Sequence, residues 1–194
     1  MTTGSVSPRR ADTRRNHELI LAVAAETLVR SDEVSFNAIA KRAQVGVGTV
    51  YRHFPTPEAL IIAVYEREVR QLVDAVPGLL AAHPPETAFR IWVTDHLAHY
   101  MMTKHGLAEA LIRATKSGER LPSSALENML GALESLLRAN IEAGNVRAEL
   151  DTRTVMRGLS GMFHLDPDGD WHGEAAKLTD LVWRGICTEQ ARPG

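Results

Sequence analysis

The chain contains little cysteine, few aromatic residues and no long apolar segment. Cys187 is the only cysteine among 194 residues, so no disulfide can form within the chain, as is usual for proteins of a reducing compartment. No segment approaches the roughly 18 apolar residues that a membrane span needs, and Met1–His17 lacks the apolar centre of a secretory signal. These absences exclude a disulfide-stapled scaffold, and we expect a cytoplasmic protein that does not contact a membrane.

Recognisable catalytic motifs are absent as well. The sequence has no nucleophile elbow, phosphate loop or dinucleotide fingerprint, so we expect neither an enzyme nor a cofactor. His96, His99 and His105 lie close in sequence, but no cysteine or nearby glutamate completes a metal site. An enzyme that uses the helix containing these histidines is the alternative function from the class of catalytic proteins.

The acidic stretch Asp166–Asp170 differs from a calcium loop, because its glycine precedes the third acid and Lys177 occupies the twelfth position. We interpret it as a turn.

Neither sign of charge dominates the whole chain, but the charges are unevenly placed. The formal net charge is −2, which by itself disfavours nucleic acid as a partner. Residues 1–57 carry 8 lysines and arginines against 5 acids, a net charge of +3, whereas the rest of the chain carries 14 against 19, a net charge of −5. A basic start joined to an acidic body is typical of a nucleic-acid-binding module attached to something else; a solvated basic tail is the alternative. Half of these N-terminal cations are Arg9, Arg10, Arg14 and Arg15.

Helical periodicity is present along nearly all of the chain after the first dozen residues. Apolar residues recur three and four positions apart, as in Ile20, Val23 and Ala24, and no segment alternates in the manner of a strand. The sequence therefore predicts an all-α protein of about nine helices. After the first, the helices are expected at about Ser35–Ala43, Val47–Phe54, Pro57–Val76, Glu86–Thr103, Gly106–Ser117, Pro122–Ala143, Thr152–Phe163 and Glu174–Thr188.

The segment Ser35–Phe54 has the layout of a helix-turn-helix, in which the second helix enters the major groove of DNA. A helix leads into the short turn Gln44–Gly46 and then into a second helix, with Ala40 where the two helices must approach closely. Val50 and Phe54 are four residues apart and are expected to pack inward. A helical hairpin that binds no DNA is the alternative. The side chains left for the outer faces, which can reach phosphates or bases, are Thr49, Tyr51, Arg52 and His53.

The residues around this turn resemble a known family. Ile39–Ala43 followed by Val45–Leu60, with its run Gly-Thr-Val-Tyr-Arg-His-Phe-Pro-Thr, resembles the DNA-binding signature of TetR-type transcriptional regulators. The resemblance covers about residues 14–65 of the chain. It implies a dimeric, all-helical protein with a three-helix DNA-binding head, and a larger C-terminal body that holds a small-molecule pocket and the dimer interface.

Composition and the resemblance together suggest how the chain is divided. We expect a mobile basic arm over residues 1–12, a helix-turn-helix DNA-binding domain over 13–57, a connecting helix over 57–76, and a ligand-binding and dimerisation domain over 77–194. The DNA-facing residues that the resemblance implies are Asn37, Val47, Gly48, Thr49, Tyr51, Arg52, His53 and Thr56.

Two positions depart from the family pattern. Gln44 stands where the family usually has a glycine, at a turn position that tends to be left-handed, and a glutamine there costs on the order of 1–2 kcal/mol unless the turn adopts another geometry. Pro57 replaces a basic residue that usually follows the Phe-Pro-Thr, which removes a phosphate-binding cation at a helix N-terminus.

The functional residues of the body are assigned from what the resemblance implies, together with residue type and position. Polarisable and aromatic side chains suit a promiscuous apolar pocket, although plain core packing is the alternative.

We expect a repressor that an unidentified small-molecule effector releases from a pseudo-palindromic, double-stranded DNA operator. The alternative is a DNA-binding regulator without such an inducer, controlled by a protein partner or by abundance. The candidate ligand-binding residues are Trp92, His96, His99, Tyr100, Met129 and Met162. The residues expected at the homodimer interface, in the last two major helices, are Leu159, Met162, Phe163, Leu178, Leu181, Val182 and Ile186.

Overall fold

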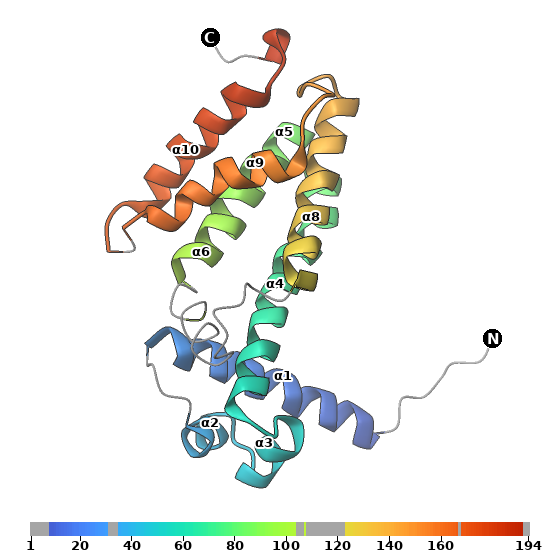
Figure 1. The fold of residues 1–194 in the computed structure, drawn as a ribbon. Helices are drawn as coiled ribbons and strands as arrows, with labels where there is room; N and C mark the ends of the chain where they lie inside the picture. Colours follow the sequence, from blue (N-terminus) through green and yellow to red (C-terminus); the bar gives the residue numbers. More distant parts are fainter. Residues whose placement is uncertain (1–7, 31–34, 104–106, 108–122, 167, 192–194) are drawn as a thin grey trace, which may run out of the picture. The chain divides into compact units, whose positions relative to one another are not determined.

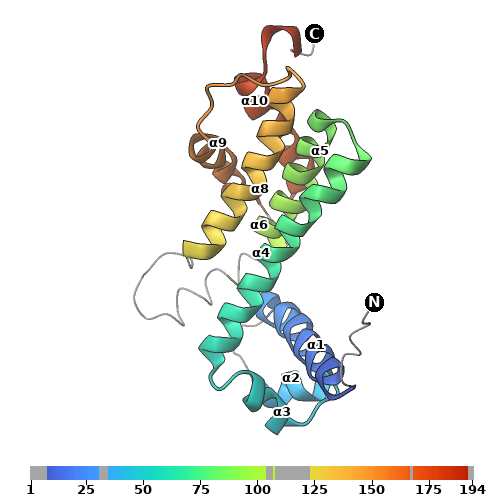
Figure 2. The same cartoon turned by 90° about the vertical axis from the view of Figure 1, so that its right-hand side faces the viewer.

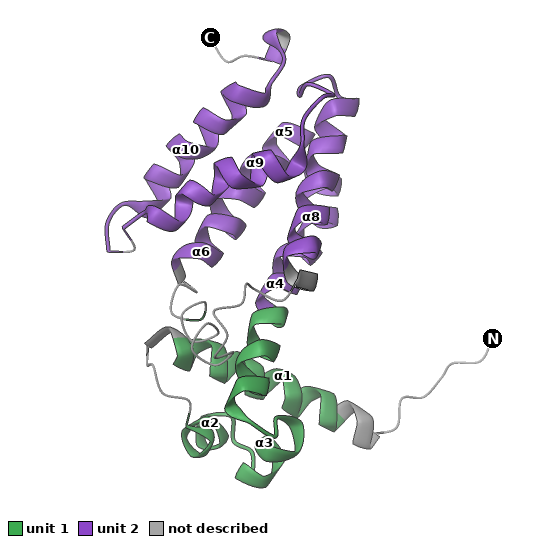
Figure 3. Ribbon diagram, in the orientation of Figure 1, with its two compact units in different colours: residues 1–67, 106–119 green, residues 68–105, 120–194 purple. Residues whose placement is uncertain are grey.

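The computed structural model describes residues 8–30, 35–103, 107, 123–166 and 168–191. Within these ranges the chain is helical and contains no strand, which confirms the all-α fold class (Figure 1). The chain forms two compact units that divide within helix α4, Pro57–Ala82, whose residues up to Arg67 belong to unit 1 and whose residues from Glu68 onward belong to unit 2 (Figure 3). Among the described helices, none combines the length and the apolar character that crossing a membrane requires.

Unit 1 is built on three helices that precede α4. These are α1, Pro8–Arg30, α2, Phe36–Arg42, and α3, Val47–His53, and α2 packs against both of the others. The predicted inward residues of α3 lie in the core, where Val50 is fully buried and Phe54 is 3% exposed. The same core takes one face of α1 and the inner side chains of α2 and α4: Ile20, Leu21, Ala24, Leu28, Ile39, Ala40, Leu60 and Val64.

Two helices of unit 1, α2 and α4, begin with a hydroxyl side chain that caps the first turn. The Ser35 hydroxyl accepts the Ala38 N–H at 3.3 Å and caps α2. The Thr56 hydroxyl accepts the Ala59 N–H at 3.2 Å, and Pro57 occupies the first position of α4, where its missing N–H has no partner to lose.

Two predicted boundaries differ from the structure, and proline is involved in both. Helix α1 begins at Pro8, so residues 8–12 are not part of an arm, because a proline with its fixed φ suits the first turn of a helix. Helix α4 continues through Pro77 to Ala82 instead of ending at Val76. An internal proline costs about 3 kcal/mol. Pro77 itself is exposed while Val76 and the leucines that follow are buried or half-buried, and their packing offsets that cost.

Unit 2 surrounds a continuous helical segment made of α5, Pro85–Ile91, the π-helical η1, Trp92–Ala98, and α6, His99–Thr103. Helix α8, Ser123–Glu142, packs on α5, and α10, Trp171–Ile186, packs on η1. Helix α9, Thr152–Leu159, contacts both α8 and α10 and continues into the short 3-10 turn η2, Ser160–His164 (Figure 2). The predicted helix Gly106–Ser117 lies outside the described residues, apart from Leu107.

The buried Asn140 of unit 2 is hydrogen-bonded to main-chain and side-chain partners. Asn140 is fully buried on α8, and its amide donates to the carbonyls of Leu136 and Pro85 at 2.9 Å each. Its side-chain oxygen accepts a hydrogen bond from the Asn145 amide at 3.1 Å. Because a buried amide left unpaired is destabilising, these bonds fix α8 against the start of α5.

The acidic stretch before α10 forms a turn and a cap. The Asp166 carboxylate accepts the Asp168 N–H at 3.0 Å. The Asp170 carboxylate accepts the Gly173 N–H at 3.0 Å, so α10 begins at Trp171 rather than at the predicted Glu174. Within the described residues no group of three histidine, cysteine or acidic side chains is arranged to hold a metal ion.

The turn between α2 and α3 holds Gln44 in the left-handed region, with φ of +56°. The Val45 N–H donates to the Ala40 carbonyl at 3.0 Å and the Gln44 N–H donates to the Lys41 carbonyl at 3.3 Å, which are the two bonds of a Schellman helix ending. Glycine takes this position without steric cost, whereas a side chain there costs on the order of 1–2 kcal/mol. The helix-turn-helix therefore carries backbone strain at its turn.

Replacing Gln44 by glycine is expected to stabilise unit 1 by about 1 kcal/mol, because relief of the strain outweighs the greater freedom of glycine in the unfolded chain. Native-state hydrogen exchange of the α2 and α3 amides measures this local stability. Gln44→Ala is the matched control: it keeps the Cβ that causes the strain and should change protection by less than about 0.5 kcal/mol. Equal or lower protection in Gln44→Gly would contradict the strain.

Candidate nucleic-acid interface

Helix α3 presents its outer face to solvent while Val50 anchors the inner face. Val47 and Tyr51 are four residues apart, so they lie on one side of the helix, and they are 39% and 55% exposed. Gly48 is exposed between them, and apart from its two chain neighbours and the backbone of its own helix no described atom lies within 4 Å of the place where a Cβ on it would stand. The outer face of α3 therefore combines exposed apolar side chains with main-chain atoms at Gly48 that a partner can approach closely.

The Tyr51 ring is held by a residue of the preceding helix. Its centroid lies 4.9 Å from that of Phe36, with the ring planes 61° apart, an edge-to-face contact. Phe36 is buried whereas Tyr51 is largely exposed. The contact positions an exposed phenol before any partner arrives, which lowers the entropy cost of using it.

Arg52 folds back along α3. Its Nε donates to the Gly48 carbonyl at 3.1 Å and its Nη2 donates to the Thr49 hydroxyl at 3.0 Å. Because the Thr49 oxygen accepts from the guanidinium, the hydroxyl proton remains free to donate to an external acceptor. Arg52 thus contributes positive charge close to the Thr49 hydroxyl.

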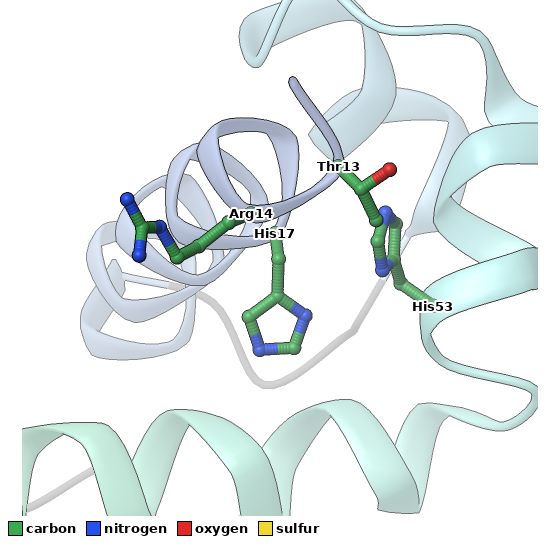
Figure 4. A pocket seen from close by; sticks show the side chains of 4 residues that line it. All are labelled: Thr13, Arg14, His17 and His53. Carbon is green, nitrogen blue, oxygen red and sulfur yellow. The ribbon is translucent and has the colours of Figure 1, made fainter. Parts of the chain in front are cut away.

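His53 lies at the end of α3 beside α1. It lines a cleft of about 300 Å³ together with Thr13, Arg14 and His17 (Figure 4). Partial burial lowers the pKa of His53, and the nearby His17 and Arg52 lower it further. His53 is therefore predominantly neutral at pH 7 in the free protein.

The other two predicted DNA-facing residues lie at helix starts. Asn37 is exposed in the first turn of α2. Thr56 is exposed as well, and its hydroxyl oxygen is engaged as the cap of α4 while its proton is left to donate. The structure therefore places all eight predicted residues in unit 1, within or next to the helix-turn-helix.

Sequence reasoning missed three residues that support this face. Phe36 holds Tyr51, and His17 lines the cleft beside His53. Arg42 donates to the Glu26 carboxylate at 2.6 Å and to the Thr27 hydroxyl at 2.9 Å, which joins α2 to α1. Of these three residues, only His17 could have been found from the sequence. It precedes Ile20 by three residues and therefore lies on the apolar face of α1.

The six predicted ligand-binding residues lie in unit 2 but in different surroundings. Trp92 is fully buried, and its indole N–H donates to the Leu72 carbonyl at 2.9 Å, so its only donor is already engaged within the core. The remaining five are two buried methionines, two half-buried side chains and one exposed histidine: Met129, Met162, His96, Tyr100 and His99.

The seven predicted dimer residues fall into two groups, and three of them need correction. Leu159, Met162 and Ile186 are at most 6% exposed, because they lie on the inner faces of their helices and pack within their own unit. They do not offer surface to a partner. Phe163 and Leu181 are 40% and 67% exposed. Leu178 and Val182 are half-buried.

Comparison with known proteins gives consistent matches to both parts of the chain. Residues 20–64 match the family model of bacterial regulatory proteins, tetR family, and residues 84–188 match the model of the C-terminal domain of SbtR-like transcriptional regulators. A curated relative, the HTH-type transcriptional regulator SAR0097 of Staphylococcus aureus (strain MRSA252), is 27% identical over 146 residues, which are 74% of this chain and 76% of the relative.

Two of the solved structures that match resemble most of the chain. The TetR transcriptional regulator SCO0520 from Streptomyces coelicolor is 36% identical, with a TM-score of 0.77 and coverage of 89% of this chain and 99% of that one. A TetR transcription regulatory protein from Mycobacterium vanbaalenii is 34% identical, with a TM-score of 0.74 and coverage of 93% and 100%. With the exposed face of α3 and the family models on both segments, these similarities show that the chain belongs to the TetR family of DNA-binding transcriptional regulators.

Proposed function

We propose that this regulator is a homodimeric repressor that leaves a pseudo-palindromic operator when a small molecule binds its C-terminal body. The observation that carries the proposal is the outer face of α3, where Val47 and Tyr51 are exposed on a helix fixed by the buried Val50. A helix of this kind enters the major groove and meets base edges with its first residues. The protein would act in the cytoplasm, where it meets bacterial DNA.

The side chains of this face have distinct roles at the groove. Val47 reads by apolar contact with a thymine methyl, and Thr49 donates its free hydroxyl proton to a base or phosphate. The Gly48 backbone allows close approach. The remaining residues contact the DNA backbone and set the docking position: Asn37, Tyr51, Arg52, His53 and Thr56.

A homodimer supplies the second α3 that a pseudo-palindrome requires. Two copies related by a twofold axis place their recognition helices in successive major grooves, about 34–36 Å apart. The dimer surface that we propose is the apolar patch formed by Phe163, Leu178, Leu181 and Val182. Phe163, in the turn η2, and Leu181, on α10, are large apolar side chains that stay exposed in this part of the chain, and exposed apolar side chains that gather on one surface mark a protein interface.

The effector site that we propose lies in unit 2 near His96, His99 and Tyr100, which keep partial or full exposure next to the buried Trp92. A regulator FadR from Bacillus subtilis, solved in complex with stearoyl-CoA, shares this fold with a TM-score of 0.62 at 18% identity. An effector releases DNA only by the difference in its affinity for the DNA-bound and free forms of the dimer.

A ligand screen followed by an operator-release assay tests this function. A true effector at about 100 times its Kd should stabilise the fold by about 2.7 kcal/mol, which raises the Tm by roughly 5–10 °C, and it should lower operator affinity at the same concentration. The stabilisation should be lost in Tyr100→Ala and kept in Lys177→Ala, an exposed position on α10. Stabilising compounds that leave operator affinity unchanged would favour a regulator controlled by a protein partner or by abundance.

A further inference from the structure

The cleft between α1 and the end of α3 collects groups that bind anions. Thr13, Arg14 and His17 contribute to it from three positions within little more than one turn of α1, and His53 contributes from the last residue of α3 (Figure 4). Its volume of about 300 Å³ is large enough for a phosphate group with its water. A hydroxyl, a guanidinium and two imidazoles all donate hydrogen bonds to phosphate oxygens.

The two imidazole rings are held in place by the core beneath them. The His17 ring stacks on the buried Phe54 ring, with centroids 5.0 Å apart and planes 29° apart. It meets the His53 ring edge-on at a centroid distance of 5.4 Å. Two adjacent ring positions are therefore fixed by packing, so a ligand that bridges them meets a site that is already ordered. Figure 4 shows the Arg14 guanidinium directed away from the two rings; it is exposed and free to rotate toward a ligand.

The charges around His53 disfavour its protonation in the free protein. The charged or titratable groups that act on it are His17 on α1 and its neighbour Arg52 on α3, and Arg14 lines the same cleft with its guanidinium directed away from the rings. Among the described residues that line the cleft there is no carboxylate. An anion is the missing partner of such a set, because it would offset the repulsion that His17 and Arg52 exert on a protonated His53.

We propose that the cleft lined by Thr13, Arg14, His17 and His53 binds one backbone phosphate of the operator and takes up a proton when it does. The proposal rests on the proposed function, because it requires that α3 docks on DNA. It adds to that function a phosphate site shared with α1 and a dependence of operator affinity on pH.

The direction of this dependence follows from linkage. Burial, His17 and Arg52 lower the pKa of His53 in the free protein, whereas a phosphate within hydrogen-bond distance raises the same pKa in the complex. Binding therefore takes up protons at pH values between the two pKa values. Operator affinity rises as the pH falls through the pKa of the complex, and it becomes constant below the pKa of the free protein.

The experiment measures operator affinity by fluorescence anisotropy from pH 8 to pH 6 at constant ionic strength, with an operator first selected from random DNA. The wild type should gain about tenfold more affinity over this range than His53→Gln, because each proton taken up contributes up to tenfold per pH unit. His17→Gln should also reduce the dependence of operator affinity on pH, because it removes one of the groups that lower the pKa of His53 in the free protein. His83→Gln, which changes an exposed histidine outside the cleft, is the matched control and should keep the wild-type slope.

Two outcomes would overturn the inference while leaving DNA binding intact. One is the same pH slope in the wild type and in His53→Gln. The other is a uniform loss of affinity in His53→Gln at every pH, which would make His53 a contact that takes up no proton. Failure to select any operator would instead count against the proposed function itself. Thermal unfolding of His17→Gln at each pH separates loss of the Phe54 stacking from loss of the effect of His17 on the pKa of His53.

A second arm distinguishes a DNA phosphate from free inorganic phosphate. Operator affinity is measured at pH 6.5 with chloride replaced by inorganic phosphate at equal ionic strength. A site for the DNA backbone should lose less than about threefold in affinity, because a single free phosphate lacks the other contacts of the duplex. A loss of more than tenfold in the wild type that is absent in His53→Gln would assign the cleft to the free ion and overturn the proposal.

Discussion

Replacing Leu181 by glutamate is expected to convert the proposed dimer into a monomer. Leu181 is 67% exposed in the single chain, and a twofold interface uses it twice, once from each copy. Removing two leucines from an interface costs about 1.5–3 kcal/mol each. The loss is therefore at least about 3 kcal/mol, or roughly 100-fold in dimer affinity, before the penalty for burying two unpaired carboxylates. Analytical ultracentrifugation measures the change in mass directly.

Ala176→Glu on the same helix is the matched control for this change. Ala176 is exposed and lies five residues before Leu181, so it points about 140° away around the helix. It introduces the same charge into α10 without touching the apolar patch, and the dimer should persist. A dimeric Leu181→Glu variant would place the interface elsewhere, and dissociation of both variants would indicate a general effect of charge on α10.

Replacing Tyr51 by alanine is expected to weaken operator binding by at least about 100-fold without changing the mass of the dimer. A hydrogen bond to a charged phosphate contributes about 1.5 kcal/mol or more, and the dimer uses two such bonds, so the loss is about 3 kcal/mol or more. The ring also loses its edge contact with Phe36. Anisotropy titrations of the selected operator, at one stated salt concentration, measure the change.

Tyr51→Phe separates the phenol from the ring. It keeps the contact with Phe36, 4.9 Å between centroids, and removes only the hydroxyl. We expect it to lose most of the affinity that Tyr51→Ala loses, while its unfolding stays within about 0.5 kcal/mol of the wild type. Operator affinity within threefold of the wild type in both variants would show that α3 docks without this side chain.

The local features of the DNA-binding face were predictable from the sequence because they depend on spacing along one helix. Val50 and Phe54, four residues apart, point inward and leave Tyr51 outward. The positive φ of Gln44 follows from the short turn that must reverse the chain between two helices. Ser35 and Thr56 act as caps for the same reason, since a cap depends only on the next three residues.

Features that depend on contacts between distant residues were not predictable. His17 stacks on Phe54, 37 positions away, and no local pattern indicates that contact. Leu159 and Leu181 both stand in amphipathic helices, yet one is buried and the other exposed, because each helix packs against different neighbours. Trp92 has the size and shape of a cavity wall, but its indole N–H is bonded to Leu72, a partner on another helix. Pro77 signalled a helix end that packing overrides.

Selection of DNA from a random pool by the purified wild-type protein tests the central claim most directly, because the selection itself reveals the operator sequence. The DNA-binding face of α3 predicts enrichment of a pseudo-palindrome whose two half-sites are centred about one helical turn, roughly 10 base pairs, apart. Tyr51→Ala, carried through the same rounds, should enrich it far less. A wild-type pool that stays random after repeated rounds at moderate salt would contradict DNA binding by this face.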